Sequence, residues 1–171
     1  MTETERAALC TQVAGLTLPR WDELPDLELY MDQVLSLMER YLGAYPGYDR
    51  KGLTASMVNN YVKQGVMPPP VKKKYTRIHL AHLVLICVLK GSFPIELIKS
   101  LILAASGELD RAGYDRFCGE FEASMRRAAE EVSGDGALAA IGGMALRAQA
   151  SRALTLRLYD AAFPPQEKSK K

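Results

Sequence analysis

Apolar and polar residues recur with helical spacing along most of this chain. Between residues 26 and 42, apolar side chains repeat every three or four positions, which predicts a helix from the N-cap Asp26 to about Leu42. The same spacing over 109–132 and 137–162 predicts two longer helices near the C-terminus. The run from Leu80 to Leu89 is apolar on every side, which predicts a buried central helix. The pattern therefore predicts an all-α fold.

The stretch from residue 53 to residue 102 has the clearest helix boundaries. Thr54 is a good N-cap for a short helix over Ala55–Gln64, and Gly65 follows at the position where a residue without Cβ is favoured. Three prolines at 68–70 exclude a helix and force an extended path. Thr76 then caps the apolar helix, which Gly91 ends, and Pro94 lies near the first turn of a third helix.

The short helix after Thr54 has two different faces. Val58, Tyr61 and Val62 form its apolar face. The opposite face is polar and mostly neutral, and it consists of Ser56, Asn59, Asn60 and Lys63. Amide side chains suit a helix that reads base edges in the DNA major groove, because asparagine can bond adenine through two hydrogen bonds. This face is therefore the candidate contact surface.

Charge is distributed unevenly along the chain. The net charge is +2, but residues 1–49 contain 3 basic and 9 acidic side chains, residues 50–99 contain 9 and 1, and residues 100–171 contain 10 of each. The three segments therefore have charges of −6, +8 and 0. A basic segment in a nearly neutral protein is the pattern expected of a surface that contacts a phosphate backbone. The alternative is a lysine-rich solvated surface.

The run NNYVKQGVMPPP, Asn59 to Pro70, resembles the end of the recognition helix and the start of the wing in MerR-type regulators. The matching positions are Tyr61, Gly65, Val66, Met67 and Pro68, followed by Tyr75 and Thr76 at the start of the next helix. The chain is more closely similar, over roughly residues 18–160, to an uncharacterised family of small bacterial proteins. Its marks are DLxLYMDQ (Asp26 to Gln33), NNYVK and KKY.

The resemblance implies a MerR-like winged helix-turn-helix with two departures. About ten residues separate Leu42 from Leu53, whereas a helix-turn-helix connection usually has three or four. Only Val71 to Lys74 stands where MerR-type proteins have a longer hairpin, so the wing is expected to be vestigial. Asn59 and Asn60 replace the Arg and first Tyr of the MerR pattern, so the DNA sequence bound must differ.

The expected DNA-binding residues lie on the short helix and in the basic segment that follows it. The polar face of the short helix would meet bases, while Tyr61, by analogy with the family, and the basic residues after the prolines would position the backbone. The full set is Ser56, Asn59, Asn60, Tyr61, Lys63, Lys72, Lys73, Lys74 and Arg77.

No pattern in the chain supports catalysis or a cofactor. Nucleotide-binding, hydrolase and metalloprotease motifs are all missing, so we expect no enzyme and no cofactor. His79 and His82 lie three apart, but Cys87 lies on another face of the same helix, so a metal site is not expected. The three cysteines lack CxxC spacing, and the N-terminus has no signal-peptide pattern. With no stretch of 18 apolar residues, these features favour a reduced, cytoplasmic protein without a membrane span.

The expected organisation is a MerR-like DNA-binding core over 18–105 and a helical C-terminal region over 106–163, for dimerisation or as a lid. The expected function is sequence-specific binding of double-stranded DNA by a transcriptional regulator. The rivals are a protein-interaction or assembly module of the same fold, and a regulator that senses an unknown small-molecule effector.

Two arrangements of the C-terminal helices are open. A homodimer could form through a seam of Phe117, Phe121, Met125, Leu154 and Leu158. Alternatively, these helices could fold over the apolar helix as a lid and leave a monomer. Gly142 and Gly143 indicate either a close approach of another helix or a kink.

Overall fold

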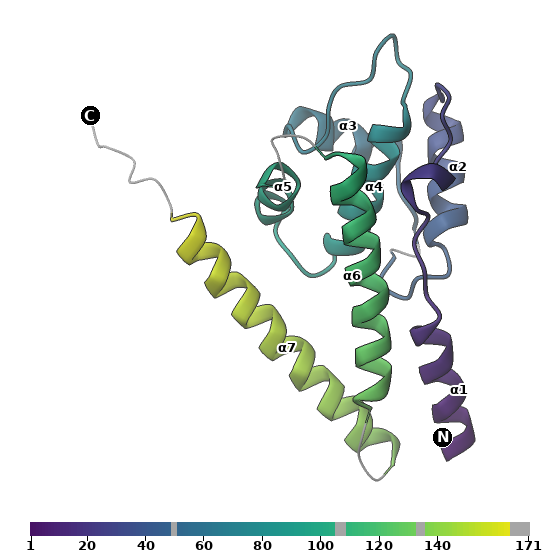
Figure 1. Cartoon of the computed structure of the whole chain (residues 1–171), viewed down its shortest axis with the longest axis vertical. Helices are drawn as coiled ribbons and strands as arrows, with labels where there is room; N and C mark the ends of the chain where they lie inside the picture. The colour runs from purple at the N-terminus through teal and green to yellow at the C-terminus, as the bar shows by residue number, and fades with distance from the viewer. Residues whose placement is uncertain (49–50, 105–108, 133–135, 165–171) are drawn as a thin grey trace.

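The computed structural model describes residues 1–48, 51–104, 109–132 and 136–164. These residues form seven α-helices and one 3₁₀ turn and no extended strand, so the predicted all-α fold is confirmed (Figure 1). The helices are α1 (Glu3–Ala14), α2 (Met31–Leu42), α3 (Ala55–Lys63), α4 (Arg77–Leu89), α5 (Ile95–Ala104), α6 (Arg111–Glu130) and α7 (Ala137–Ala162), and the 3₁₀ turn is η1 (Trp21–Glu23).

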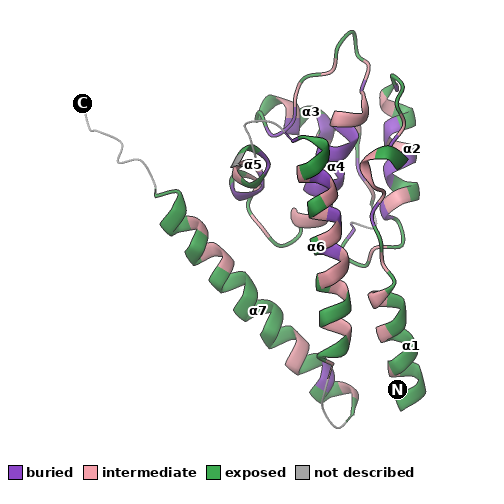
Figure 2. Cartoon of the chain, viewed as in Figure 1, coloured by how far each residue is buried: buried purple, intermediate pink, exposed green. Residues whose placement is uncertain are grey.

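The core is built around α4, as its uniformly apolar sequence predicts. All nine residues from His79 to Cys87 are buried, and α2 and α5 pack directly against this helix (Figure 2). Helix α3 packs against α2 and contributes Val58 and Tyr61 to the same cluster. Because α4 is buried on every side, it needs neighbouring elements all round it. The first half of α6 adds Tyr114, Cys118 and Phe121 to the same buried cluster.

Helix α2 starts later than the sequence predicts. We expected Asp26 to cap it, but the helix begins at Met31 after the N-cap Tyr30. Leu29 instead pairs in an antiparallel bridge with Tyr75, and each backbone N–H donates to the other residue's carbonyl oxygen at 2.8 Å. The Tyr30 N–H then donates to Gln33 Oε1 at 2.9 Å, which caps the helix from its own first turn.

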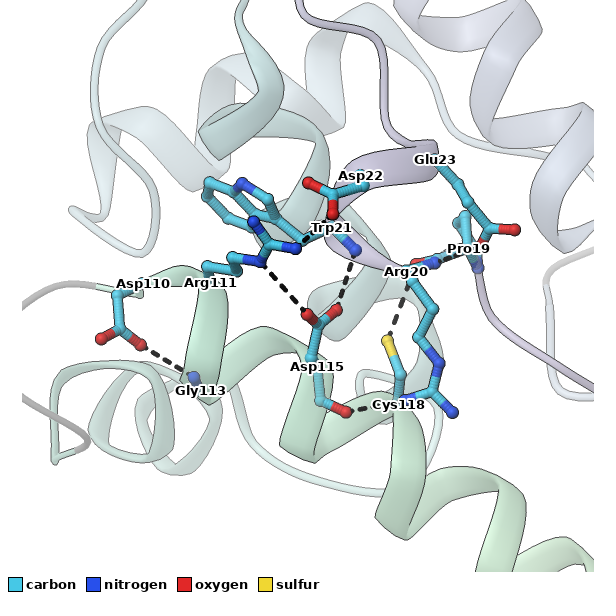
Figure 3. A network of polar contacts seen from close by, with 10 residues as sticks. All are labelled: Pro19, Arg20, Trp21, Asp22, Glu23, Asp110, Arg111, Gly113, Asp115 and Cys118. Atoms are coloured by element: carbon cyan, nitrogen blue, oxygen red, sulfur yellow. Dashed lines mark hydrogen bonds and ion pairs between the residues drawn. The ribbon is translucent and has the colours of Figure 1, made fainter.

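The segment before α2 is locked onto the start of α6 (Figure 3). The Trp21 backbone N–H donates to Asp115 Oδ1 at 2.8 Å, and the Arg20 guanidinium donates to the Asp115 carbonyl oxygen at 2.8 Å. The Cys118 thiol lies 3.7 Å from the Pro19 carbonyl oxygen. Because residues 109–121 share one buried cluster with residues 18–102, the core is continuous across the expected boundary at residue 105.

Helix α7 extends away from this core. It diverges from α6 in Figure 1 and is exposed along most of its length in Figure 2. Among the described helices, α7 packs closely with none, whereas α1 lies along α6. Three side chains tie it to the rest of the chain. Arg147 donates to the Glu131 carbonyl oxygen at the end of α6 at 2.6 Å, and Arg152 Nε donates to the Ser92 carbonyl oxygen at 2.8 Å. The Tyr159 hydroxyl lies 3.4 Å from Ser100 Oγ. Among the described residues, no helix is both long and apolar enough to cross a membrane.

Candidate nucleic-acid interface

Helix α3 has well-defined ends, as its sequence predicts. Thr54 Oγ1 accepts a hydrogen bond from the Met57 N–H at 3.3 Å and caps the N-terminus. Gly65 has a φ of +66°, and the next N–H, of Val66, donates to the Tyr61 carbonyl oxygen at 2.9 Å. This is a Schellman ending, which favours glycine because other residues are strained at positive φ. Both ends of the short helix are therefore fixed.

The polar face of α3 is exposed and has no partner in the described part of the chain. The side chains of its four residues make no hydrogen bond or ion pair with any other described residue. Two of them are the only asparagines in the protein. Because nothing within the described fold explains an amide pair at this place, the face is available for an external partner. The four residues are Ser56, Asn59, Asn60 and Lys63.

Residues Val71–Lys74 form a tight turn that we call the lysine hairpin. The Val71 N–H donates to the Lys74 carbonyl oxygen at 3.2 Å, and the Lys74 N–H donates back to Val71 at 2.9 Å. Lys72 and Lys73 form its two-residue tip, with φ values of 50° and 64°. Two-residue hairpin turns with positive φ at both positions strongly prefer Asn-Gly, so two lysines here are strained.

The base of the lysine hairpin is fastened to the segment before α2. Lys74 Nζ pairs with Glu28 Oε2 at 2.7 Å, and this contact raises the pKa of the lysine. Next to it, the Leu29–Tyr75 bridge joins the two backbones. The two sequence motifs DLxLYMDQ and KKY are therefore in contact, and these contacts hold the hairpin in place. The loop that contains the hairpin projects from the end of the molecule that carries α3 (Figure 1).

The structure divides the nine expected contact residues into two groups. Tyr61 is 7% exposed, and burial raises the pKa of its hydroxyl to about 12. Arg77 Nε donates to the Leu24 carbonyl oxygen at 3.0 Å, and its guanidinium lies 3.7 Å from Asp26. Tyr61 is therefore buried, and Arg77 and Lys74 are held by contacts within the fold. The other six, which are exposed, are Ser56, Asn59, Asn60, Lys63, Lys72 and Lys73.

Residues 19–116 match the family described as Domain of unknown function (DUF1836). That is more than half of the chain. The protein belongs to the DUF1836 family. The expected resemblance to an uncharacterised family is thus confirmed, while its MerR-like part stays a prediction. No curated protein and no solved structure matches the chain. The DUF1836 region includes α2 to α5 and the lysine hairpin, whereas α1, most of α6 and all of α7 lie outside it.

The two histidines of the DUF1836 region serve the fold. His79 Nδ1 accepts a hydrogen bond from the Thr76 N–H at 3.0 Å, and its Nε2 lies 3.3 Å from the Pro69 carbonyl oxygen. This arrangement fastens the proline segment to α4, and burial lowers the pKa of His79. His82 Nδ1 lies 2.7 Å from the Ile78 carbonyl oxygen. In the described ranges, no three His, Cys, Asp or Glu side chains are grouped as a metal site requires.

Sequence reasoning missed one cation beside α3. Lys99, on α5, donates from Nζ to the Gln64 carbonyl oxygen at 3.1 Å, at the C-terminal end of α3. A positive charge is favourable there because the helix dipole is negative at this end. Gly65 leaves room for the ammonium, since a Cβ on this residue would come within 3.2 Å of Lys99 Nζ. The residues lie 35 positions apart, so only the packing of α5 beside α3 could reveal the pair.

Proposed function

We propose that the protein is a sequence-specific DNA-binding transcriptional regulator with a MerR-like helix-turn-helix core. In this proposal α3 is the recognition helix and the lysine hairpin is its vestigial wing. The observation that supports it most strongly is the strained pair Lys72 and Lys73 at the hairpin tip. Strain in a backbone persists where the surrounding structure enforces it, and it often coincides with function. Two ammonium groups held at a projecting tip suit phosphate oxygens.

Base readout would come from the exposed face of α3. An asparagine amide can accept a hydrogen bond from adenine N6–H through its oxygen and donate one to adenine N7 through its NH₂ group, and this pair of bonds discriminates adenine from other bases. Asn59 and Asn60 are free to do so because neither is hydrogen-bonded to another described side chain. Lys63, on the same face, would add a phosphate or guanine contact. The hairpin tip would then set the register of the protein on the duplex.

The first experiment measures binding of the full chain to duplex DNA. Fluorescence anisotropy with a random duplex pool at low salt should show binding that weakens as salt rises, because cations on the protein release counterions from the phosphates. Selection from the same pool should then enrich a defined sequence. Absence of binding at low salt, with a folded protein, would refute the proposal.

Two substitutions separate base readout from backbone contact. Asn60→Ala should relax the preference at one base by about 1–3 kcal/mol, whereas Lys73→Ala should weaken all sequences alike. Gln149→Ala is the matched control, because it removes an exposed amide from α7, distant from the candidate interface. If Asn60→Ala weakens binding equally for every sequence, α3 does not read bases.

A second candidate is a protein-interaction or assembly module without DNA contact. Several large apolar side chains of α7 are strongly exposed, as Leu138 at 86% and Leu146 at 73% show. Exposed apolar surface on this scale is typical of an interaction site. The DNA-binding experiment discriminates the two candidates, since an assembly module would associate with protein while leaving duplex DNA unbound.

A further inference from the structure

One side of α7 is an apolar surface that no part of the described chain covers. Leu146, Leu154 and Leu158 are 73%, 61% and 62% exposed. At 100° per residue, they lie on the side of the helix opposite Arg152 and Tyr159, through which α7 touches Ser92 and Ser100. Arg147, which lies on the leucine side, reaches the Glu131 carbonyl oxygen at the end of α6 and leaves the three leucines uncovered. Three exposed leucines at helical spacing form a continuous stripe rather than scattered surface residues.

The glycines of α7 have no structural reason within one copy of the chain. Gly142 and Gly143 lie inside the helix, where glycine is destabilising relative to alanine. A Cβ built on either residue would meet nothing within 4 Å. The close-approach reason expected from the sequence is therefore not fulfilled by this chain itself. A helix that packs on α7 from outside would fulfil it, because small residues let two backbones approach.

We propose that α7 pairs antiparallel with α7 of a second copy, about a two-fold axis at Ala150. With the axis there, Leu146 lies opposite Leu154 of the partner subunit, and the same contact recurs on the other side of the axis. Gly143 lies opposite Arg157 of the partner subunit, so a small residue faces a long one. Such self-complementarity is what a two-fold interface requires. The two copies would pair in this way whether or not the protein binds DNA.

The size of α7 is sufficient for a dimer of this kind. A helix of 26 residues is about 39 Å long and about 10 Å wide, so covering half its circumference buries about 600 Å² per copy. The two copies together would bury about 1,200 Å², which is the lower end of the range for specific interfaces. Removal of leucine side chains from water would drive the association.

An apolar groove lies at the N-terminal end of α7 and extends the apolar surface of this helix. It has a volume of about 440 Å³ and lies between α1, the end of α6 and the start of α7. Leu9, Val132, Ile141 and Met144 are among its lining residues. In the antiparallel pair, the last turn of the partner subunit's α7 lies beside this end of the helix.

The first test measures the mass of the full chain by sedimentation and light scattering at micromolar concentration. We expect a species of twice 18.9 kDa. Leu146→Glu with Leu154→Glu should yield the 18.9 kDa monomer without loss of helicity or thermal stability, because both side chains are exposed in one copy. Leu27→Glu is the control, since Leu27 is also strongly exposed, at 57%, but lies before α2. A monomeric native chain, or a dimer unaffected by the double substitution, would overturn the proposal.

The second test locates the two-fold axis by cysteine cross-linking. Ala150→Cys should form a disulfide between the two copies on mild oxidation, because the axis brings the residue next to itself. Ala139→Cys is the matched control, since its two copies would lie about 33 Å apart at 1.5 Å per residue. Mixing Ala139→Cys with Ala161→Cys should restore cross-linking. The native chain controls for Cys10. A dimer in which Ala150→Cys does not cross-link, or a monomer that instead binds anionic vesicles through α7, would overturn the pairing.

Discussion

Replacing the hairpin tip by Asn-Gly should separate the stability of the fold from DNA binding. Lys72 and Lys73 have φ values of 50° and 64°, a region that costs most L-residues about 1–2 kcal/mol each. Asparagine tolerates this region better than lysine, and glycine enters it freely. Lys72→Asn with Lys73→Gly should therefore raise the free energy of unfolding by about 1–2 kcal/mol. In a chain of this size, that raises Tm by about 2–8 °C.

The same double substitution removes two cations from the proposed phosphate contact. Each phosphate contact contributes about 0.9 to the slope of log K against log salt, so the slope should fall in magnitude by about 2. Thermal unfolding and anisotropy on the same samples give both numbers. The expected result is a more stable protein that binds DNA more weakly, a combination that a merely damaged fold cannot produce.

Two control pairs isolate the causes. Lys72→Gln with Lys73→Gln removes the charges but keeps side chains that are strained at positive φ, so DNA binding should fall while Tm stays unchanged. Arg116→Gln with Arg126→Gln makes the same change in net charge at exposed positions of α6 and should leave the salt slope unchanged. If the Asn-Gly variant binds DNA with the affinity of the native chain and the same slope of log K against log salt, the hairpin does not act as a wing.

Two further predictions concern the core. Val84→Asp should prevent folding, because Val84 is completely buried and a lone carboxylate there costs several kcal/mol; circular dichroism and exchange protection would detect it, and a well-folded variant would show that α4 is not central. His79 should make stability fall as pH decreases below about 6.5, because burial lowers its pKa in the folded state and the unfolded chain therefore binds the proton more readily. Urea unfolding at pH 7.5 and 5.5 should show this loss, and His79→Gln should reduce it.

The elements that the sequence predicted well are those with one dominant signal. Helix α4 is apolar on all sides, its N-cap is Thr76 as the sequence predicts, and it ends at Leu89 with the C-cap Lys90, just before Gly91. Helix α3 ends at a glycine with positive φ for the same reason. Local rules suffice where no distant segment competes for the same backbone groups.

The start of α2 shows what local rules omit. Asp26 is a good N-cap, and a helix from there would have been allowed by the residues that follow. Instead, Leu29 pairs with Tyr75, and Glu28 pairs with Lys74, 46 residues further along the chain. These contacts depend on the packing of two distant segments, which periodicity in one segment cannot predict. A vestigial wing was expected over Val71 to Lys74, but its two-residue turn was not predicted, because Lys-Lys lacks the Asn or Gly that marks such a turn.

The C-terminal seam was assigned to the wrong side of α6. Phe117 and Met125 pack against the core, and Phe121 is 7% exposed, so their stripe faces inward rather than toward a partner. The sequence showed apolar stripes on both C-terminal helices but not which of them the body would cover. That depended on the arm before α2, whose Arg20 and Trp21 fasten the start of α6 to the core.

Fewer of the positive charges in residues 50–99 are exposed and unpaired in the structure than the sequence indicates. Lys74 and Arg77 are paired with acidic side chains before α2, and Lys90 Nζ is buried. Eight of the nine cations lie in the described part of the chain, and three of these are exposed there without a partner: Lys63, Lys72 and Lys73.

This difference gives a quantitative expectation for DNA binding. Three phosphate contacts per copy correspond to a slope of log K against log salt of about −3, and a dimer that places both copies on DNA doubles it to about −5. If all eight excess charges of the segment acted, one copy alone would give about −7. Titrations of the native chain and of Leu146→Glu with Leu154→Glu between 50 and 200 mM salt measure the slope of dimer and monomer. A monomer slope near −7 would show that Lys74 and Arg77 leave their ion pairs to contact DNA, and it would contradict the division of the site derived from the structure.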